Sequence, residues 1–543
     1  SSLLLLLGVV GLVLLMASAN VASLVLVRIE HRHQETGLRL ALGAGASGVA
    51  RPFLAESGII AAIGATAGLA IAVGAGGLLE RWGPPELTRL GAIRIDVPVL
   101  AFTVVVTGLA CLVFGLLPVA TGLRATVVAQ LRDGGRAATI GGPRARLRRA
   151  LVAVEAALAV TLVIGAGLLV KSFTKLRAME PGFDPVGVVT MDLSLNSADY
   201  PGQTAVTVFH EALNERLLRV PGVVAAGAIR VLPFDGRPGL ESMKPTDRAT
   251  DPHDYWNAEY QVVSPGTLEA LGVPLRAGRR LAASDRAGAP AVALVNQAMA
   301  DAFWPDGGPI GRTVKFGEPT TETPVLTIVG VVGNVRQGGY RTEAAPQIYV
   351  PRAQAGAIYG GQATRFATLV VRSSLPPVAA MTAVRQVVRE LDPRLPAANL
   401  STMTRVMAGS VTDERFLAGT VGVFSVLALV LAAVGLGGIV AYTVERRTRE
   451  LGVRLALGAR RRGILAGILR GALTLVGLGA LAGTAVGLAA GRLLEHHLFG
   501  VSSTDPGVFV AAPLVLTAAA LGAALLPAAR ATRIDPIEAM RAE

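Results

Sequence analysis

Few residues of this chain have the types and spacing that catalysis or metal binding requires. The single cysteine, Cys111, excludes an internal disulfide framework and a cysteine-rich zinc or iron–sulfur site. His210 and His253, the histidines of the long polar region, lack metal-ligand spacing, and Ser, His and Asp form no nucleophile motif there. Residues 165–172 resemble a phosphate-binding loop but lack its second glycine and end an apolar run. The sequence therefore predicts a protein that is not an enzyme and has no metal or cofactor of its own.

A block of charged residues and glycines occurs twice, each time directly after an apolar stretch. The shared residues are Glu35, Gly37 and Arg39 in the first copy and Glu450, Gly452 and Arg454 in the second. Glu and Arg four residues apart lie on one face of a helix and can form an ion pair. Each block therefore predicts a short amphipathic helix on the inner membrane surface, either an interfacial anchor without a partner or a docking site for another protein. Its occurrence in both copies favours docking.

The two blocks belong to a longer internal repeat. Without a gap, positions 35–80 match positions 450–495 at 20 of 46 residues, which indicates a tandem duplication. Within the repeat, small residues at intervals of four leave a face on each helix that permits close helix–helix packing. The glycines of this face are Gly64, Gly68 and Gly76 in the first copy and Gly479, Gly483, Gly487 and Gly491 in the second. We expect these faces to serve packing and not a pore.

Seven stretches are long and apolar enough to cross a bilayer, which requires about 20 residues. They are 3–27, 53–79, 98–120, 150–170, 416–444, 464–491 and 508–529. Because unsatisfied backbone groups are costly in lipid, these stretches must be helices. Glu155 is one of their few ionisable residues. We expect it to pair with Arg148 or Arg149 near the inner interface, in preference to a role in proton relay.

The polar region 172–415 alternates short β-like runs with amphipathic helical runs. Two β-α-β units flank it, at 186–195, 204–219 and 223–232 and at 367–372, 377–391 and 397–400, with further strands at 291–295 and 325–335 and a short helix at 296–304. These units are ferredoxin-like in style. The predicted fold is therefore a multi-span α-helical membrane protein with a mixed α/β extracytoplasmic domain, in which an inserted mainly-β lobe separates the two ferredoxin-like β-α-β units.

The distribution of basic residues predicts the orientation of the chain. Its net charge is +13, yet region 172–415 contains 24 Lys and Arg against 23 Asp and Glu. The excess lies in loops between the apolar stretches, with four Arg at 28–51 and seven at 445–462. Such basic loops remain on the cytoplasmic side, so we expect the C-terminus inside and region 172–415 outside. With no basic, aromatic-bearing module left over, the sequence argues against a nucleic-acid partner.

The duplicated block, the tail at 525–541 and several motifs of the polar region resemble the MacB/FtsX-type ABC transporter permeases. The motifs include Pro-Gly-Phe-Asp at 181–184, Leu-Gly-Val at 271–273 and Val-Gly-Val-Val-Gly-Asn-Val-Arg at 329–336. The arrangement is most similar to the family's duplicated permeases, which have no ATPase of their own. Because the chain starts without Met inside an apolar stretch, we expect a fragment that lacks the family's first helix and first extracytoplasmic domain.

The resemblance implies a domain organisation and a way of working. It implies FtsX-like three-helix membrane cores at 1–135 and 416–543, a basic linker and single helix at 136–171, and a MacB-like extracytoplasmic domain at 172–415. A separate cytoplasmic ABC ATPase would hydrolyse ATP, and the two charged blocks would lie at the coupling surface. Movement of the outer domain in the bacterial inner membrane would then serve export or mechanotransmission, on an unknown extracytoplasmic substrate or protein.

Two other functions are compatible with the same residues. The chain can be a non-transport regulator whose outer domain activates a cell-envelope enzyme, as FtsX-type proteins do. It can also be a membrane-anchored extracytoplasmic binding protein that has lost its ATPase partner. Association with an ATPase distinguishes the first two functions from the third, and transport requires in addition that a cargo stimulates ATP hydrolysis.

Overall fold

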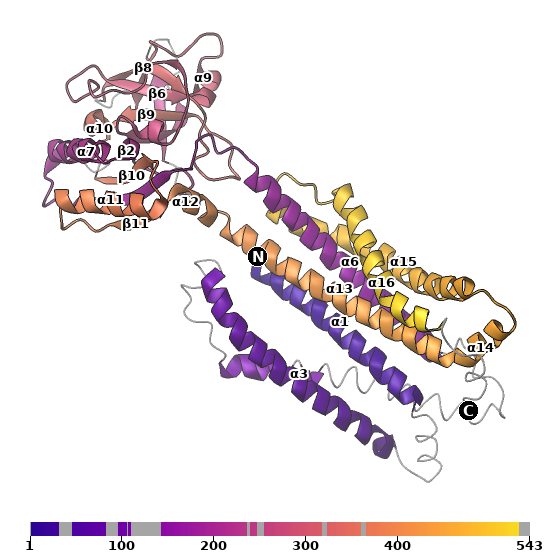
Figure 1. Cartoon of the computed structure of the whole chain (residues 1–543). Coiled ribbons are helices and arrows are strands. Elements are labelled where there is room, and N and C mark those ends of the chain that lie inside the picture. Colours follow the sequence, from indigo (N-terminus) through magenta and orange to yellow (C-terminus); the bar gives the residue numbers. More distant parts are fainter. Residues whose placement is uncertain are drawn as a thin grey trace. The chain divides into compact units, whose positions relative to one another are not determined.

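The structure, a computed structural model, divides the chain into two compact units (Figure 1). The membrane unit comprises Ser1–Lys175 and Asp413–Glu543, and the outer unit comprises Leu176–Thr412. The residues that the structure describes are 2–31, 46–82, 96–105, 107–109, 143–235, 239–246, 255–317, 323–359 and 365–531. The outer unit starts and ends within a few residues of the predicted polar domain 172–415.

The membrane unit consists of long apolar helices. They are α1 (Ser2–His31), α3 (Ala46–Trp82), α6 (Pro143–Arg177), α13 (Thr412–Arg446), α15 (Arg461–Leu494) and α16 (Pro506–Ala531), with the short α14 (Thr448–Ala456) between α13 and α15. Within the described residues, five helices are long and apolar enough to cross a membrane. They correspond to α1, α6, α13, α15 and α16. At the other two predicted spans, shorter apolar helices lie at Gly58–Gly74 and Val97–Leu109.

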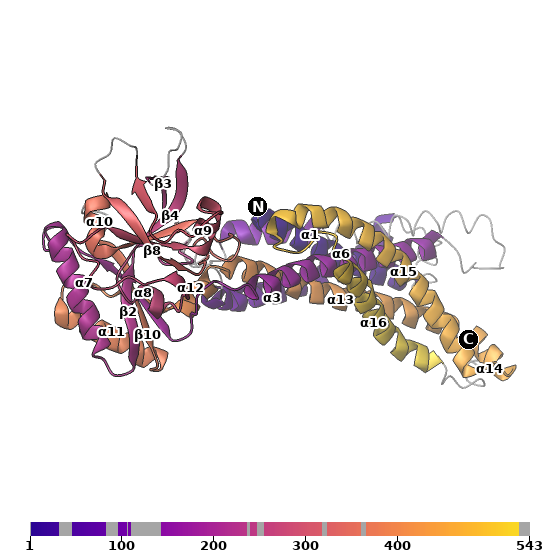
Figure 2. The same ribbon diagram turned by 90° about the horizontal axis from the view of Figure 1, so that it is seen from above.

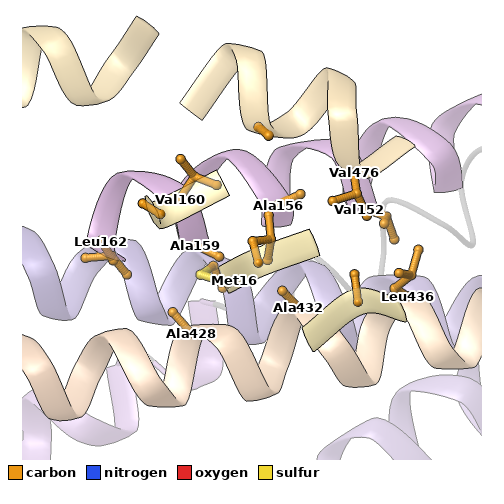
Figure 3. Close-up of a cluster of buried hydrophobic side chains, with 14 of the residues drawn as sticks. Met16, Val152, Ala156, Ala159, Val160, Leu162, Ala428, Ala432, Leu436 and Val476 are labelled. Atoms are coloured by element: carbon orange, nitrogen blue, oxygen red, sulfur yellow. The ribbon is translucent and has the colours of Figure 1, made fainter. Parts of the chain in front are cut away.

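Small side chains let three of these helices approach closely around α6. Met16 of α1, Ala159 of α6 and Ala428 of α13 are all fully buried in one cluster (Figure 3). The cluster extends to α15 through Val476. Without a hydrophobic force between helices in lipid, such packing depends on close van der Waals contact, which alanine and glycine permit. Helix α6 therefore forms the centre of the bundle.

The outer unit is built on one mixed sheet of eleven strands (Figure 2). Four strands come from the two flanking β-α-β units: β1 (Val188–Ser194), β2 (Val223–Ile229), β10 (Phe366–Ser373) and β11 (Ala398–Thr402). They are neighbours in the order β11-β1-β10-β2, and each pair is antiparallel. The unit helices α7 (Gly202–Leu218) and α11 (Pro377–Leu391) pack on this part of the sheet through a shared apolar cluster that includes Phe209, Leu369 and Val384.

The inserted lobe extends the same sheet. Its strands are β3 (Leu240–Pro245), β4 (Trp256–Val263), β5 (Leu275–Gly278), β6 (Val292–Asn296), β7 (Thr313–Phe316), β8 (Val325–Val332) and β9 (Gln347–Pro351), and its helices are α8 (Thr267–Ala270), α9 (Gln297–Phe303) and α10 (Arg352–Tyr359). A single pair, Ile229 with Val263, joins β2 to β4. Trp256, Trp304 and Phe316 are among the residues of the lobe's own buried cluster.

The chain enters and leaves the outer unit at neighbouring strands. Helix α6 leads to β1, and β11 leads through α12 (Met403–Gly409) to α13. Strands β1 and β11 are antiparallel, with Val189 opposite Thr402 and Thr190 opposite Ser401. Both connections to the membrane helices therefore leave from the same end of one strand pair.

Candidate functional site

Helix α14 carries the second copy of the charged block. Arg454 Nη2 lies 2.6 Å from Glu450 Oε1, so the i,i+4 ion pair expected from the spacing is present. Gly452, between them, is buried. The helix stops before Gly458, whose φ of +88° is a conformation that glycine adopts without steric cost. The charged block therefore forms a short helix with an ordered ion pair on its surface.

The apolar side chains of this segment are divided between the bundle and the surface. Leu451 is buried in the cluster that also contains residues of α6, α13 and α15. By contrast, Val453 and Leu457 are 40% and 83% exposed. Helix α14 is thus anchored to the bundle on one side and presents apolar and charged groups on the other.

The first copy of the block cannot be compared in the same way. Glu35, Gly37 and Arg39 lie outside the described residues. Their place at a coupling surface stays a prediction.

The glycine face of α15 lies directly against α6. A Cβ added at Gly479 would lie 2.6 Å from the carbonyl oxygen of Ala153, and one added at Gly483 would lie 2.9 Å from Ala157 Cα. The hydroxyl of Thr161 on α6 also donates a hydrogen bond to the carbonyl of Gly483, at 3.1 Å. Any larger residue at these positions would force the two helices apart.

The other two glycines of α15 are equally close to their neighbours. A Cβ at Gly487 would lie 2.7 Å from Ile164 Cδ1 of α6. A Cβ at Gly491 would lie 2.5 Å from the carbonyl oxygen of Ser503, in the loop before α16. The glycine face of α15 therefore contacts α6 at its first three glycines. At the fourth, Gly491, it contacts the loop between α15 and α16.

The first-copy glycines have different surroundings. A Cβ at Gly64 or Gly68 would meet no atom of another described segment within 4 Å. Gly76 is half-buried. Packing through these three residues stays a prediction.

Two polar contacts, which we call the α6 clasp, join the end of α6 to the loop between α15 and α16. Lys171 Nζ lies 2.6 Å from Asp505 Oδ2. The backbone N–H of Phe499 donates to Ser172 Oγ at 2.8 Å. The hydrogen bond from Lys171 lowers the pKa of Asp505 below its usual range. The loop is therefore tied to the last turns of α6 before the chain enters the outer unit.

Residues 165–172, whose sequence resembles a phosphate-binding loop, form no such loop in the structure. These residues are helical throughout, as part of α6, and the Lys171 ammonium binds a carboxylate of the same chain. Sequence reasoning missed Asp505 as the partner of Lys171, because a Lys and an Asp 334 residues apart have no spacing signal.

Glu155 does not form the ion pair expected from the sequence. Among the described residues, neither of its carboxylate oxygens has a hydrogen-bond partner, although the side chain is fully buried. The Arg148 guanidinium lies 4.2 Å from the ring centre of Tyr442 on α13. Cation–π attraction thus binds one of the two arginines, Arg148 and Arg149, that were predicted to pair with the acid.

The outer unit contains a cavity of about 830 Å³ where three sequence motifs meet. Its lining residues are Glu180, Pro181, Gly182, Phe183, Asp184, Gly272, Pro274, Arg276, Gln297, Gly333, Asn334, Arg336 and Ala344. The motifs at 181–184, 271–273 and 329–336 contribute most of this lining. The sequence indicated each motif separately, but their convergence depends on strand order and had no signal of its own.

Close backbone contacts hold the motifs together. Gly182 has a φ of +86°, and any Cβ there would collide with the carbonyl oxygen of Asn334. The N–H of Asp184 donates to the carbonyl of Leu271 at 2.9 Å. The first motif is therefore fixed to both of the others by its backbone.

One arginine binds within this arrangement, and another lines the cavity without a partner among the described residues. Arg372 of β10 donates to Asp184 Oδ2 at 2.9 Å, to the Asp184 carbonyl at 2.8 Å and to the Ala270 carbonyl at 2.9 Å. Arg276, by contrast, is exposed in the cavity and forms no hydrogen bond or ion pair within the described part of the chain. The cavity can therefore present a free guanidinium to an anionic or carbonyl-bearing group.

Comparison with known families gives matches over both units. The MacB-like periplasmic core domain matches residues 99–391, which is more than half of the chain. The FtsX-like permease C-terminal domain matches twice, at residues 7–127 and 422–536. The chain is a MacB/FtsX-type permease. The two FtsX-like matches cover the two copies of the internal repeat, and the MacB-like match includes most of the outer unit.

Curated relatives of this permease include exporters. It is 27% identical over 273 residues to the pyoverdine export ATP-binding/permease protein PvdT of Pseudomonas syringae pv. tomato, covering 50% of this chain and 40% of that protein. It is 28% identical to the macrolide export ATP-binding/permease protein MacB of an Azoarcus species, again over 50% and 40%. The uncharacterized ABC transporter permease YknZ of Bacillus subtilis is 24% identical, over 63% of this chain and 86% of that one. The permease thus spans less than half the length of the two exporters.

Solved structures of related outer domains also match. The periplasmic region of MacB from Actinobacillus actinomycetemcomitans aligns at 12% identity with a TM-score of 0.30, covering 43% of this chain and 96% of that one. Together, the apolar helices and the periplasmic-core match indicate an inner-membrane protein with an extracytoplasmic domain.

Proposed function

We propose that this chain is a permease subunit that couples ATP hydrolysis by a separate cytoplasmic subunit to movement of its extracytoplasmic domain, for export or mechanotransmission. The proposal assigns the charged surface of α14 to the contact with the ATPase. It assigns the bundle around α6 to transmission. The ATP would be bound by the partner subunit.

One observation carries the proposal: an unbroken series of contacts runs from α14 to the end of α6. Leu451 anchors α14 in the apolar cluster of the bundle. Helix α15 follows α14 after four residues and lies against α6 through Gly479, Gly483 and Gly487. The α6 clasp then ties the α15–α16 loop to the last turns of α6. Because α15 lies backbone-close against α6 and the clasp joins the following loop to the same helix, we expect a displacement of α14 to reach the end of α6.

Three further expectations from the sequence belong to the proposal: the orientation in the membrane, the ferredoxin-like units and a contact of the outer domain with a substrate or protein. The arginines at 445–462 support a cytoplasmic position for α14 and for the C-terminus. The strand order β11-β1-β10-β2 supports a ferredoxin-like description of the two flanking units. The cavity with its free Arg276 supports contact of the outer domain with an extracytoplasmic substrate or protein.

Paired substitutions test the coupling surface. Glu450→Gln with Arg454→Gln removes both charges of the α14 ion pair while keeping side-chain size. Glu215 and Arg219 on α7 form an exposed ion pair with the same i,i+4 spacing, so Glu215→Gln with Arg219→Gln is a matched control. The full chain is purified from its own host membranes, and the amount of nucleotide-labelled ATPase that accompanies it is measured.

We expect the α14 variant to lose most of the accompanying ATPase and the α7 variant to retain it. Equal amounts with both variants would contradict the assignment of α14. Absence of any ATPase with the unchanged chain would instead support an anchored binding protein. Where the ATPase is present, faster ATP hydrolysis with an added cargo supports transport, and activation of an envelope enzyme without cargo supports the regulatory alternative.

A further inference from the structure

The buried acid Glu155 is a feature of the bundle that the coupling proposal does not use. Its side chain has no exposed surface, and it lies within the α6 span Arg146–Arg177. No described residue donates a hydrogen bond to either oxygen. An ionised carboxylate without a partner is among the most costly groups to bury inside a membrane protein.

Two other helices meet Glu155 at a single glycine. A Cβ built on Gly435 of α13 would contact Glu155 Oε2 and would lie 2.6 Å from Asn20 Oδ1 of α1. One oxygen from α6 and one from α1 therefore lie together in the space that a side chain at position 435 would occupy. Asn20 is itself classed among the buried polar residues.

The orientation of the Asn20 amide follows from its other contact. Asn20 Nδ2 donates to the carbonyl of Leu431 on α13 at 2.9 Å. A carbonyl only accepts, so the NH₂ group must face Leu431 and Oδ1 must face the space beside Gly435. Asn20 consequently offers Glu155 an acceptor and not a donor.

Two acceptors that face one space without a donor repel one another, and a proton on one of them removes the conflict. Among the described residues, no charged group forms a hydrogen bond with Glu155 in place of that proton. Arg148, two turns away on the same helix, lies over the Tyr442 ring. From α1 and α13, the groups at this space are the Asn20 amide and a glycine, neither of which titrates.

We propose that Glu155 binds a proton and, as a neutral carboxylic acid, donates it in a hydrogen bond to Asn20 Oδ1 beside Gly435. The site is a proton-binding site inside the membrane bundle. It links α6 to α1, while the Asn20 amide links α1 to α13 through Leu431. Three helices are thus joined by one proton and one amide group.

Infrared spectroscopy of the full chain in lipid nanodiscs tests the proton directly. The C=O stretch of a protonated carboxylic acid is separate from the bands of carboxylates. We expect the difference spectrum between the unchanged chain and Glu155→Gln to contain one such band per chain at neutral pH. Glu445→Gln, an exposed acid on α13, is the control and should remove no protonated-acid band. Absence of the band from the Glu155 difference spectrum would overturn the proposal.

Two further variants test the geometry and do not require Glu155 to be changed. Asn20→Ala removes the acceptor and should shift the acid band to higher frequency, as expected for a weaker hydrogen bond. Gly435→Ala should shift the band as well, because its Cβ occupies the space between the oxygens. Gly438→Ala, on the same helix with nothing within 4 Å of its Cβ, should leave the band in place. An unchanged band in Asn20→Ala would show that the proton is not shared with α1.

Discussion

The ammonium group of Lys171, near the end of α6, lies 2.6 Å from Oδ2 of Asp505, at the start of α16. This ion pair is the last in the series of contacts that runs from α14 through α15 and the following loop to α6. It holds the loop between α15 and α16 to the helix that continues into the outer unit. Lys171 is 46% exposed and Asp505 is 16% exposed, so the pair is partly accessible to solvent.

Loss of the clasp charge should loosen the loop more than it destabilises the protein. For Asp505→Asn we expect a stability loss of at most about 1 kcal/mol, because partly exposed ion pairs contribute little. Hydrogen exchange of backbone amides at 495–505 should accelerate, whereas Glu495→Gln in the same loop should leave it unchanged. Because the pKa of Asp505 is lowered, the protection should persist at neutral pH and disappear as acid protonates the carboxylate. Unchanged exchange in Asp505→Asn would show that the ion pair does not hold the loop.

Substitution of Gly483 should separate α15 from α6. The added Cβ of Gly483→Ala would lie 2.9 Å from both Ala157 Cα and Val160 Cβ, and overpacking of this kind costs about 1–3 kcal/mol. Gly477 on the same helix has nothing within 4 Å of its Cβ, so Gly477→Ala should be neutral or stabilising by up to about 1 kcal/mol. Thermal unfolding in nanodiscs measures both. Equal midpoints would mean that the helices tolerate a wider separation.

Arg372 should resist replacement by lysine. Its planar guanidinium donates to two groups of Asp184 and to the Ala270 carbonyl at once, a geometry that an ammonium cannot reproduce. We expect Arg372→Lys to destabilise the outer unit by about 2 kcal/mol, since hydrogen bonds to charged groups contribute about 1.5–3 kcal/mol each. Arg385→Lys, on the exposed face of α11, is the control. Unfolding monitored by the fluorescence of Trp256 and Trp304 measures the difference, and equal effects would refute a special role for Arg372.

The outer unit should lose stability in mild acid because of His210. Burial, together with the positive charge of Arg352, holds the pKa of His210 well below its usual 6.5. The unfolded chain therefore binds a proton that the folded chain does not, and stability falls as pH decreases below about 6.5. The slope from one such group is at most about 1.4 kcal/mol per pH unit. The same fluorescence assay should show a smaller pH slope for His210→Gln and an unchanged slope for His496→Gln. A wild-type slope in His210→Gln would assign the effect to other groups.

Local patterns predicted the parts of the fold that depend on neighbouring residues. The segment 377–391, which begins with proline and is amphipathic, is α11 without a change of boundary. The segments 186–195 and 223–232 contain β1 and β2. The ion pair between Glu450 and Arg454 also followed from spacing alone, because its partners lie one helical turn apart.

Such local patterns could not predict contacts between segments that are distant in the sequence. Strand β9 (Gln347–Pro351) is fully buried and pairs in parallel with β4, but its five residues include Gln and Pro and show no β-like alternation. The prediction for Glu155 was wrong for a related reason. Proximity along α6 suggested Arg148 or Arg149, whereas Arg148 lies over the ring of a tyrosine on another helix, Tyr442.

The pairing of β1 with β11 places both connections to the membrane helices on neighbouring strands. The chain arrives from α6 at the Val189 end of β1 and departs toward α13 from Thr402, which lies opposite Val189. If α6 and α13 move unequally, as the proposed function allows, we expect Val189 and Thr402 to be displaced relative to one another. The backbone hydrogen bonds of this strand pair would then be the first in the outer unit to be strained.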